Sequence, residues 1–443
     1  MKNKFDTVEK FDTVEKVEKF LNTIPQFVEK TGVERCRLLL KELGSPQDKL
    51  KVIHVAGTNG KGSVCSYINE ILIHNGYKTG FFTSPHLVDI RERIRLCNDM
   101  VSKDTFIRYF NRVYEAALRL KKDNTDIAYF DYFLAIAMCI YSDENVDYVV
   151  METGLGGKLD ATNAIAHPVL SVITTISLEH TAILGDTLEK IATEKAGIIK
   201  KGVPVVFLAK KDETTAVFIN KAKEAGTVYT AVMPKDYKIR ENKANYIDFL
   251  VNNEYYKNDC FVIDSKAIYQ VENCTLALTA AAVMQRYNIA HIDIQCSRKA
   301  VREAHWEGRM EEVLPDVYVD GAHNPEGIDA FISSVKGMCQ GKSCMLLFSV
   351  VRDKNFEQMI SKLCACGLFD EYVITQVGGA RQLDDKSMKD VFMKYTGKNI
   401  TEHVSVRDAF DYALNNKKHL LVCAGSLYLT GEIKSIISSY TAE

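Results

Sequence analysis

A short polar stretch near the start of the chain combines a glycine-rich turn with a lysine. It follows the apolar run VIHVA (residues 52–56), and an amphipathic segment begins at about Ser63. A strand, a tight turn and a helix start together form an anion site, because backbone N–H groups and the positive end of the helix dipole face the ligand. A lysine in the turn adds a positive charge. The sequence therefore predicts an ATP phosphate-binding loop made of Gly57, Thr58, Asn59, Gly60, Lys61, Gly62 and Ser63.

The spacing of this loop departs from the common G-x-x-x-x-G-K-[ST] motif. Val55 stands where that motif has its first glycine, and Gly62 stands where it has the hydroxyl residue that binds magnesium. The departure disfavours an ordinary kinase or GTPase. A magnesium ion that accompanies the nucleotide must find its protein ligands elsewhere in the chain.

Three further apolar runs also end in polar residues. Ser84 follows TGFFT, Glu152 ends DYVVME, and His180 comes shortly after VLSVITT. Because the carboxyl ends of parallel strands meet at one edge of a sheet, we expect these side chains to lie near Lys61. A hydroxyl and a carboxylate suit a hard cation, whereas an imidazole is less usual on magnesium and is often an ordinary hydrogen-bonding residue.

The elements that carry these residues alternate in kind. Short β-branched runs and longer amphipathic runs follow one another from Val52, which predicts parallel strands with crossover helices. Alternation between Tyr237 and Asp264 predicts an antiparallel hairpin. The sequence thus predicts an α/β fold: a P-loop-type, mostly parallel sheet domain over residues 1–296 with a small antiparallel β element, then a smaller Rossmann-like α/β domain over residues 297–443.

Composition narrows the classes of protein that remain. The chain has 443 residues, 47% of them hydrophobic, which is enough for more than one core. Its formal net charge of -2 predicts no general attraction to nucleic acid or to a membrane. No apolar run reaches membrane-spanning length, and the charged N-terminus lacks a signal-peptide pattern, so we expect a cytoplasmic protein. A monomer is the default expectation.

Two local features carry no predicted chemistry. The segment KFDTVE occurs twice, at Lys4–Glu9 and Lys10–Glu15, and predicts a helical end. The 12 cysteines are scattered, and Cys364 and Cys366 have one residue between them, where a zinc or redox pair has two. We expect buried free thiols.

Eight motifs follow one another between about Thr31 and Gly431: HVAGTNGKGSV, FTSPHL with ERIRL, METGLGGKLDATN, EHTAILGDTLEKIATEKAGIIK, ENCTLAL, WEGRME, DGAHNP and GSLYLTGE. Together they resemble the folylpolyglutamate synthase/dihydrofolate synthase family of the Mur ligase superfamily. The resemblance implies an ATP-dependent ligase that joins L-glutamate to a folate or to dihydropteroate through an acyl phosphate.

The resemblance also implies a metal site and a modified lysine. Ser84, Glu152 and His180 match the family residues that hold Mg²⁺, of which two ions are expected. Lys195 matches a lysine that carbon dioxide carboxylates on its N6 atom. Only a neutral amine reacts in this way, and a free lysine is neutral in only about 4 of 10,000 molecules at pH 7. Without the resemblance, Lys195 would be an ordinary surface lysine of a helix.

Other motifs match substrate contacts. The family's ATP contacts correspond to Asn273, Arg309 and Asp320, and the amino-acid site corresponds to His323 and Ser426. For the folate, the matching residues are Phe130, Leu159, Asp160 and Ala161, where the Phe130 ring is suited to stack on a flat heteroaromatic group. From the residues alone, DGAHNP could be only a turn and a helix start, and Phe130 could be ordinary core. Asp160 and His323 both remain candidates for the group that accepts the ammonium proton.

Four residues depart from the family pattern. Glu179 replaces an Asp, Asp131 replaces a Glu, Lys158 replaces a frequent Arg, and Glu307 replaces the usual Pro before Gly-Arg. Only the change at Glu307 alters the charge. The class of activity is therefore retained, whereas the substrate preference stays open.

Three other classes of protein share parts of this pattern. A muramyl-peptide ligase carries a large domain before its phosphate loop, whereas only 56 residues precede Gly57. A P-loop ATPase would usually have a hydroxyl residue after the loop lysine. A non-catalytic nucleotide-binding module would not need Lys61, Glu152, His180 and Lys195 together. The sequence does not distinguish dihydrofolate synthase from folylpolyglutamate synthase activity, or predict the length of the glutamate tail or the preferred one-carbon form.

Overall fold

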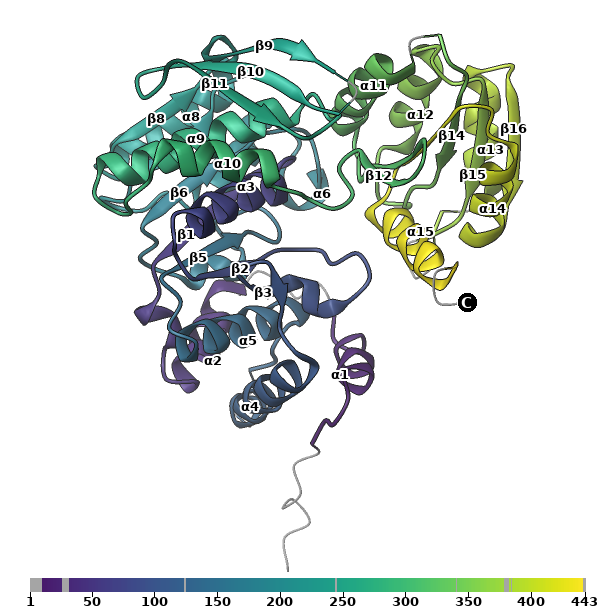
Figure 1. Ribbon diagram of the computed structural model, residues 1–443. Helices are drawn as coiled ribbons and strands as arrows, with labels where there is room; N and C mark the ends of the chain where they lie inside the picture. Colours follow the sequence, from purple (N-terminus) through teal and green to yellow (C-terminus); the bar gives the residue numbers. More distant parts are fainter. Residues whose placement is uncertain are drawn as a thin grey trace, which may run out of the picture. The chain divides into compact units, whose positions relative to one another are not determined.

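The computed structural model describes residues 10–25, 32–122, 125–243, 245–339, 341–377, 382–383 and 385–440. The chain forms two compact units (Figure 1). The larger unit consists of Met1–Asp236, Asn252–Lys257 and Asn273–Val301, and the smaller unit consists of Tyr237–Val251, Asn258–Glu272 and Arg302–Glu443.

The larger unit is built on an eight-stranded sheet in the order β4-β3-β2-β5-β1-β6-β7-β8. Its strands are β1 (Val52–Ala56), β2 (Thr79–Phe82), β3 (Ile94–Leu96), β4 (Asp99–Met100), β5 (Tyr148–Glu152), β6 (Leu170–Ile173), β7 (Val205–Leu208) and β8 (Tyr229–Val232). Strands β3 and β4 run antiparallel at one edge, and the other six are parallel. Every residue of β1 and β5 is buried, as expected for parallel strands covered on both faces. The predicted mostly parallel sheet is confirmed.

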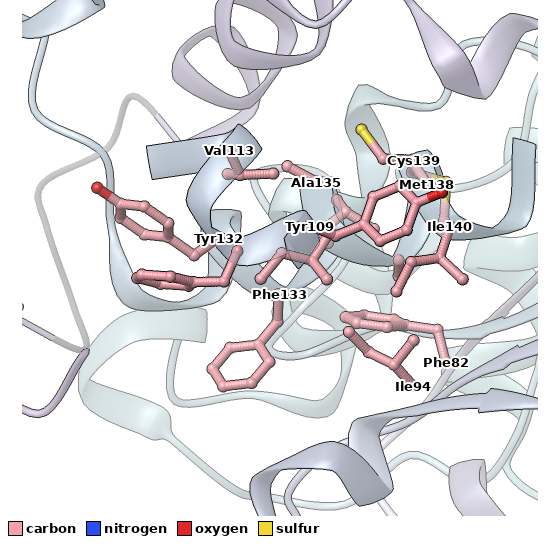
Figure 2. Packing of buried hydrophobic residues seen from close by; sticks show 14 of the residues in the cluster. Phe82, Ile94, Tyr109, Val113, Tyr132, Phe133, Ala135, Met138, Cys139 and Ile140 are labelled. Carbon is pink, nitrogen blue, oxygen red and sulfur yellow. The ribbon is translucent and has the colours of Figure 1, made fainter. Parts of the chain in front are cut away.

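Helices cover this sheet on two faces. They are α1 (Val14–Leu21), α2 (Gly32–Glu42), α3 (Lys61–His74), α4 (Lys103–Lys121), α5 (Tyr129–Asp143), α6 (Thr181–Leu184), α7 (Leu188–Ala196), α8 (Asp212–Glu224), α9 (Gln270–Arg286) and α10 (Ile294–Glu303). In Figure 1, α3, α9 and α10 lie on one face, and α4 and α5 lie on the other. Figure 2 shows the core on the second side, where Phe133 and Ile140 of α5 pack with Phe82 and Ile94 of the sheet.

The smaller unit has a six-stranded sheet in the order β12-β13-β17-β14-β15-β16. Its elements are β12 (Glu311–Leu314), β13 (Val317–Val319), α11 (Pro325–Cys339), β14 (Cys344–Phe348), α12 (Phe356–Ala365), β15 (Glu371–Thr375), α13 (Asp385–Tyr395), β16 (Asn399–His403), α14 (Val406–Asn416), β17 (Leu420–Ala424) and α15 (Leu427–Tyr440). Leu346 packs with α11, α12 and α13, and Leu347 packs with α14 and α15. Successive strand residues thus face opposite layers, and the predicted second α/β sheet is confirmed.

The predicted antiparallel hairpin is part of a three-stranded sheet in the order β11-β10-β9. These strands are β9 (Tyr237–Asn242), β10 (Ile247–Asn252) and β11 (Lys257–Ile263). Strand β9 pairs antiparallel with β10, with a register shift between Asp248 and Phe249. Its mostly exposed side chains gave only a weak alternating signal, which is why the sequence indicated two strands where three are present.

The features without predicted chemistry have structural roles. The first KFDTVE copy, Lys4–Glu9, lies outside the described residues, and the second, Lys10–Glu15, runs into α1. Phe11 and Val14 of that copy are buried in the core of the larger unit. All twelve cysteines are free thiols, and seven of them are buried.

Within the described ranges, no helix is long and apolar enough to cross a membrane.

Candidate active site

The phosphate-binding loop connects β1 to α3 and needs two of its glycines. Gly57 has φ +152°, and a Cβ there would lie 1.7 Å from Thr174 Oγ1. Gly60 has φ +85°, and a Cβ there would lie 2.4 Å from Asn273 Oδ1. Helix α3 begins at Lys61, two residues before the predicted start, because Gly60 caps it in a left-handed conformation. The first-turn N–H groups therefore begin within the loop, where a phosphate would be received.

The segment after β6 holds this loop in shape. Thr58 N donates to Thr175 O at 2.7 Å. Asn59 O accepts from Thr174 Oγ1 at 2.7 Å and from Thr175 Oγ1 at 3.1 Å. Ser177 N donates to Thr58 Oγ1 at 3.1 Å. The loop conformation thus depends on a neighbouring strand end as well as on its own glycines.

Three predicted site residues meet at the ends of β1, β2 and β5. Lys61 Nζ donates to Thr58 O at 3.2 Å and lies 3.9 Å from Glu152 Oε1. The Glu152 carboxylate is buried, and its Oε2 accepts from Ser84 N at 3.0 Å. The sheet therefore brings Lys61, Ser84 and Glu152 together, as the order of the strands requires.

His180 lies beyond the end of β6, where it caps α6. Its φ is +50°, its side chain is half-buried, and its Nε2 lies 3.9 Å from Glu179 Oε1. In the part of the chain that the structure describes, no group of three or more His, Cys, Asp or Glu residues could hold a metal. Magnesium usually keeps several waters and binds few protein ligands beside a phosphate. The Glu152 carboxylate beside Ser84 therefore fits a nucleotide-associated magnesium and would not form a closed protein cage.

Lys195 lies near the end of α7, pointing at the phosphate loop. Its side chain is buried, and Nζ donates to Gly57 O at 2.7 Å. Burial lowers the pKa of Lys195 to about 7, and the nearby charge of Lys61 acts in the same direction. The structure thus places this lysine beside the phosphate loop. The local sequence alone had predicted an exposed lysine on the surface of a helix.

Glycines let the loop after β5 pack against α7. A Cβ at Gly157 would lie 2.8 Å from Glu194 O, and a Cβ at Gly197 would lie 2.4 Å from Lys158 Cα. Lys158 N donates to Glu194 O at 2.7 Å. No sequence motif predicted this contact, although the glycine pair in GLGG was a signal of close packing.

Phe130 and Asp160 both lie against Gly154. A Cβ at Gly154 would be 2.9 Å from the tip of the Phe130 ring and 3.1 Å from Asp160 Oδ2. Asp160 Oδ2 accepts from Leu155 N at 2.7 Å. Burial raises the pKa of Asp160 despite its hydrogen bonds. Of the adjoining predicted residues, Leu159 is exposed and Ala161 is buried.

Sequence reasoning missed two buried polar contacts beside these residues. Arg35 forms a buried ion pair with Asp131, the neighbour of Phe130. His54 Nε2 lies 2.8 Å from Thr162 Oγ1, and Thr162 Oγ1 donates to Asp160 Oδ1 at 2.5 Å. His54 therefore donates to the Thr162 hydroxyl. No local motif could have shown these pairs.

In the smaller unit, Asp320 joins three segments of chain. Its Oδ2 accepts from Tyr269 Oη at 2.6 Å and from Met310 N at 3.0 Å, and its Oδ1 accepts from Ala322 N at 2.8 Å. Burial raises the pKa of Asp320. A Cβ at Gly321 would lie 2.4 Å from Arg309 Nη1, so the glycine allows the guanidinium to approach the chain. Asp320 and Arg309 are thus neighbours.

The two residues predicted for the amino-acid site follow nearby turns. His323 Nδ1 lies 2.7 Å from Gly321 O. Ser426 is buried at the start of α15, and its Oγ accepts from Tyr428 N at 3.1 Å. Gly425 N donates to Ala322 O at 2.9 Å, which ties the turn before α15 to the turn before α11.

Comparison with known proteins identifies this arrangement. The Mur ligase middle domain matches residues 55–281, and the Mur ligase glutamate ligase domain matches residues 308–427. The dihydrofolate synthase/folylpolyglutamate synthase of Bacillus subtilis is 31% identical over 423 residues, which cover 92% of this chain and 95% of that protein.

Two solved structures agree over nearly the whole length. The folylpolyglutamate synthase of Thermotoga maritima has a TM-score of 0.83 at 30% identity and covers 96% of this chain and 97% of its own. That of Mycobacterium tuberculosis, complexed with ADP and AMPPCP, has a TM-score of 0.85 at 25% identity and covers 96% and 98%.

The two matched domains define a Mur ligase. Within that class, the chain belongs to the folylpolyglutamate synthase/dihydrofolate synthase family. It is an ATP-dependent ligase, so the predicted family, fold class and enzyme class are confirmed.

The buried His54 predicts a change of stability with pH. Burial lowers its pKa from 6.5 to about 3, and the charge of Lys200 contributes. An imidazole in the unfolded chain takes up a proton below about pH 6.5 that the folded chain does not take up until about pH 3, so the protein loses stability as the pH falls through this window. We expect His54→Gln to reduce that loss by up to about 1.4 kcal/mol per pH unit, measured by urea denaturation.

A matched control for this experiment is His291→Gln, which changes an exposed imidazole. It should keep the wild-type dependence of unfolding free energy on pH. Equal dependence for His54→Gln and the wild type would contradict the assignment of His54 as a buried neutral group.

Proposed function

We propose that this ligase joins L-glutamate to the carboxylate of a reduced folate, of dihydropteroate, or of both, releasing ADP and phosphate. The observation that carries the proposal is the single loop that follows β5. At its start Glu152 lies beside Lys61 of the phosphate loop, and further along Asp160 lies with Phe130 against Gly154. The same loop therefore carries an aromatic subsite and reaches the phosphate site. A ligase that phosphorylates a flat aromatic acid requires these two sites to be held close together.

The proposed reaction begins with activation of the acceptor carboxylate, which is a poor electrophile. Its oxygen attacks the γ-phosphorus of ATP, the bond to the ADP oxygen breaks, and an acyl phosphate forms. Lys61 offsets the charge that spreads over the transferring oxygens, and Arg309 is proposed to do the same from the second domain. The neutral amine of glutamate then attacks the acyl carbon, and phosphate leaves.

We assign Asn273 and Asp320 to the binding of ATP. The side chain of Asn273 touches Gly60 of the phosphate loop. The carboxylate of Asp320 is held by three hydrogen bonds beside Arg309. These contacts fix each group before the nucleotide arrives, which lowers the entropic cost of binding.

Magnesium is the cofactor that the site fits, and we propose that Ser84, Glu152 and His180 hold it. When bound, it supplies positive charge to the phosphate oxygens. Glu152 is oriented for this role because its Oε2 already accepts from Ser84 N, which leaves Oε1 directed toward the Lys61 side. A second ion is proposed on the Lys195 side of the phosphate loop.

Lys195 is proposed to carry a carboxyl group on Nζ. The neutral amine attacks carbon dioxide, a C–N bond forms, and one proton is released. A pKa of about 7 leaves about half of the amines neutral at pH 7, against about 4 in 10,000 for a free lysine. Burial near Gly57 therefore supports a reaction that an exposed lysine would rarely undergo.

We propose His323 as the group that accepts the ammonium proton of glutamate, with Ser426 lining the amino-acid site. Because the Gly321 carbonyl can only accept, Nδ1 of His323 carries the hydrogen of this contact, and Nε2 is the ring nitrogen proposed to take the proton. Asp160 is the second candidate, but hydrogen bonds from Leu155 and Thr162 already engage both of its oxygens. A role in orienting the folate, together with Leu159 and Ala161, suits Asp160 better.

We further propose that residues 1–296 form the ATP-binding domain with the phosphate loop and the folate site. Residues 297–443 would form the glutamate ligase domain, which adds the ATP contacts Arg309 and Asp320. A cytoplasmic location and a monomeric state stay predictions. That the protein binds neither nucleic acid nor membrane is also still a prediction.

The function is tested by measuring phosphate release from ATP in the presence of magnesium and L-glutamate. Three reactions are compared: one with dihydropteroate, one with tetrahydrofolate and one without an acceptor. We expect release only when both an acceptor and glutamate are present, because the acyl phosphate forms on the acceptor. The acceptor that supports release distinguishes the two activities of the family. Release without an acceptor would indicate a P-loop ATPase instead.

Loss of the Lys195 amine should affect chemistry more than nucleotide binding. We expect Lys195→Ala to lower kcat by about 100-fold or more, the scale of losing one transition-state charge contact, with the Kd of ADP changing less than about threefold. Enzyme equilibrated with ¹³C-bicarbonate should show a carbamate carbon by NMR that the variant lacks.

Lys190→Ala is the matched control, since Lys190 lies on the same helix but pairs with Asp186 at the surface. It should retain wild-type kcat and the carbamate signal. A parallel loss of turnover and ADP affinity in Lys195→Ala would contradict the proposed role.

A further inference from the structure

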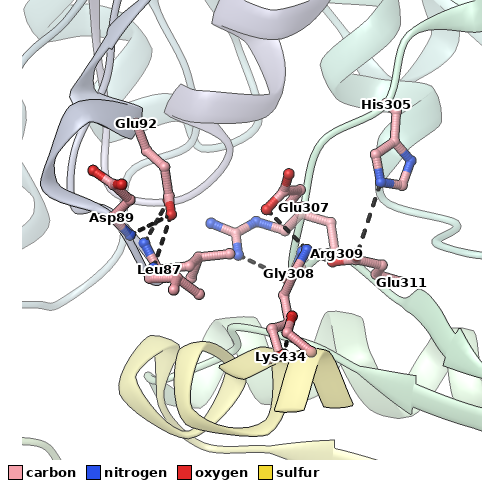
Figure 3. Close-up of polar contacts among 11 residues, drawn as sticks. Leu87, Asp89, Glu92, His305, Glu307, Gly308, Arg309, Glu311 and Lys434 are labelled. Atoms are coloured by element: carbon pink, nitrogen blue, oxygen red, sulfur yellow. Dashed lines mark hydrogen bonds and ion pairs between the residues drawn. The ribbon is translucent and has the colours of Figure 1, made fainter. Parts of the chain in front are cut away.

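In the smaller unit, one lysine of α15 bridges two carboxylates (Figure 3). Lys434 Nζ donates to Glu307 Oε2 at 2.8 Å and to Glu311 Oε1 at 2.7 Å. The lysine side chain is 19% exposed and that of Glu311 is 12% exposed. Exposed ion pairs contribute little to stability, but a largely buried one leaves an uncompensated charge when either partner is removed. The contact therefore restrains the segment that carries the two glutamates.

The restraint passes from Glu311 to Arg309 through the backbone. Glu311 Oε2, the oxygen not bound to Lys434, accepts from Gly308 N at 2.6 Å. Gly308 O accepts from Arg309 Nη1 at 2.8 Å and from Gly321 N at 2.8 Å. Three consecutive contacts thus connect the ammonium of Lys434 to the guanidinium of Arg309, as Figure 3 shows.

The backbone between these residues needs such support. Gly308 has φ +67° and Met310 has φ +48°, both in the left-handed region. For a residue with a side chain, this conformation is strained and persists only where surrounding contacts fix it. Met310 is fixed from the other side as well, since its N–H donates to Asp320 Oδ2 at 3.0 Å.

The guanidinium that this network orients keeps its charge for a ligand. Among the residues that the structure describes, no carboxylate forms an ion pair with Arg309. Its Nη1 is held by the carbonyl of Gly308, and a neutral carbonyl does not cancel the positive charge. Arg309 is therefore oriented by a carbonyl, with the Asp320 carboxylate nearby but outside ion-pair distance.

We propose that Lys434 is a positioning residue for the ligase reaction: through Glu311 and Gly308 it holds Arg309 in the orientation that binds the ATP phosphates. The inference rests on the proposed function of Arg309. It also explains Glu307, which stands where the family usually has proline. A proline stiffens the chain by fixing φ, and here the ion pair from Lys434 to Glu307 provides a restraint at the same place.

A double-mutant cycle tests this proposal. We expect Lys434→Met to raise the KM for ATP by about tenfold, since a lost hydrogen bond to a charged group is worth about 1.5 kcal/mol, with the KM for L-glutamate unchanged. Arg309→Ala should raise the KM for ATP at least as much. The double variant should match Arg309→Ala alone, because Lys434 acts only through Arg309. Lys434→Arg should restore most of the ATP affinity.

Controls separate positioning from general damage. Lys394→Met removes a lysine of the same unit that pairs with Glu357 at the surface, and it should leave the KM for ATP unchanged. If Lys434→Met does not fold, as judged by thermal unfolding, Glu311→Gln takes its place in the cycle, since it weakens the same link and keeps the side-chain shape.

The outcomes distinguish this inference from the proposed function. Additive effects of Lys434→Met and Arg309→Ala on the KM for ATP, or no effect of Lys434→Met, would overturn the positioning role of Lys434 and leave the role of Arg309 standing. An Arg309→Ala enzyme with wild-type ATP kinetics would instead overturn the role proposed for Arg309.

Discussion

The hydrogen bond from the buried Lys195 to the carbonyl of Gly57 is the contact on which the catalytic arrangement depends. It joins α7 to the phosphate loop, and it requires the amine to be buried. Burial disfavours the charged ammonium and lowers the pKa of Lys195 to about 7. The glycines after β5 let that loop pack directly on the end of α7, so the loop that begins after Glu152 and carries Asp160 lies against the same helix. The proposed phosphate, metal and lysine sites thus lie around the same helix end and loop.

The parallel sheet brings the residues of the candidate site together from separate segments of the chain. Strands β2, β5, β1 and β6 are neighbours, so the segments that follow them meet without long connections. Each polar side chain is then oriented by a backbone group close by, as Ser84 N does for Glu152 and Gly308 N does for Glu311. In both units, a backbone N–H thus fixes one oxygen of a carboxylate whose other oxygen faces a lysine, Lys61 for Glu152 and Lys434 for Glu311.

Local sequence predicted the parts of the site that local chemistry dictates. The turn of glycines around Lys61 and the polar residues at strand ends follow from strand, turn and helix rules, and the structure brings Lys61, Ser84 and Glu152 together. Contacts between distant residues were beyond those rules. His54 and Thr162 are 108 residues apart, and Lys434 and Glu311 are 123 apart, so only the packed fold brings them together. The sequence shows that Glu307 departs from the family pattern, but its ion-pair partner, Lys434, lies in α15 near the other end of the chain.

The claim that the acceptor carboxylate is activated by direct phosphorylation is tested most directly with an isotope. A folate-type acceptor labelled with ¹⁸O in the reacting carboxylate is turned over with ATP and L-glutamate, and the released phosphate is analysed by mass spectrometry. Direct phosphorylation predicts one ¹⁸O atom in each phosphate, because the carboxylate oxygen that attacks the γ-phosphorus leaves with it. Phosphate free of ¹⁸O would contradict an acyl phosphate, since its fourth oxygen would then have come from water.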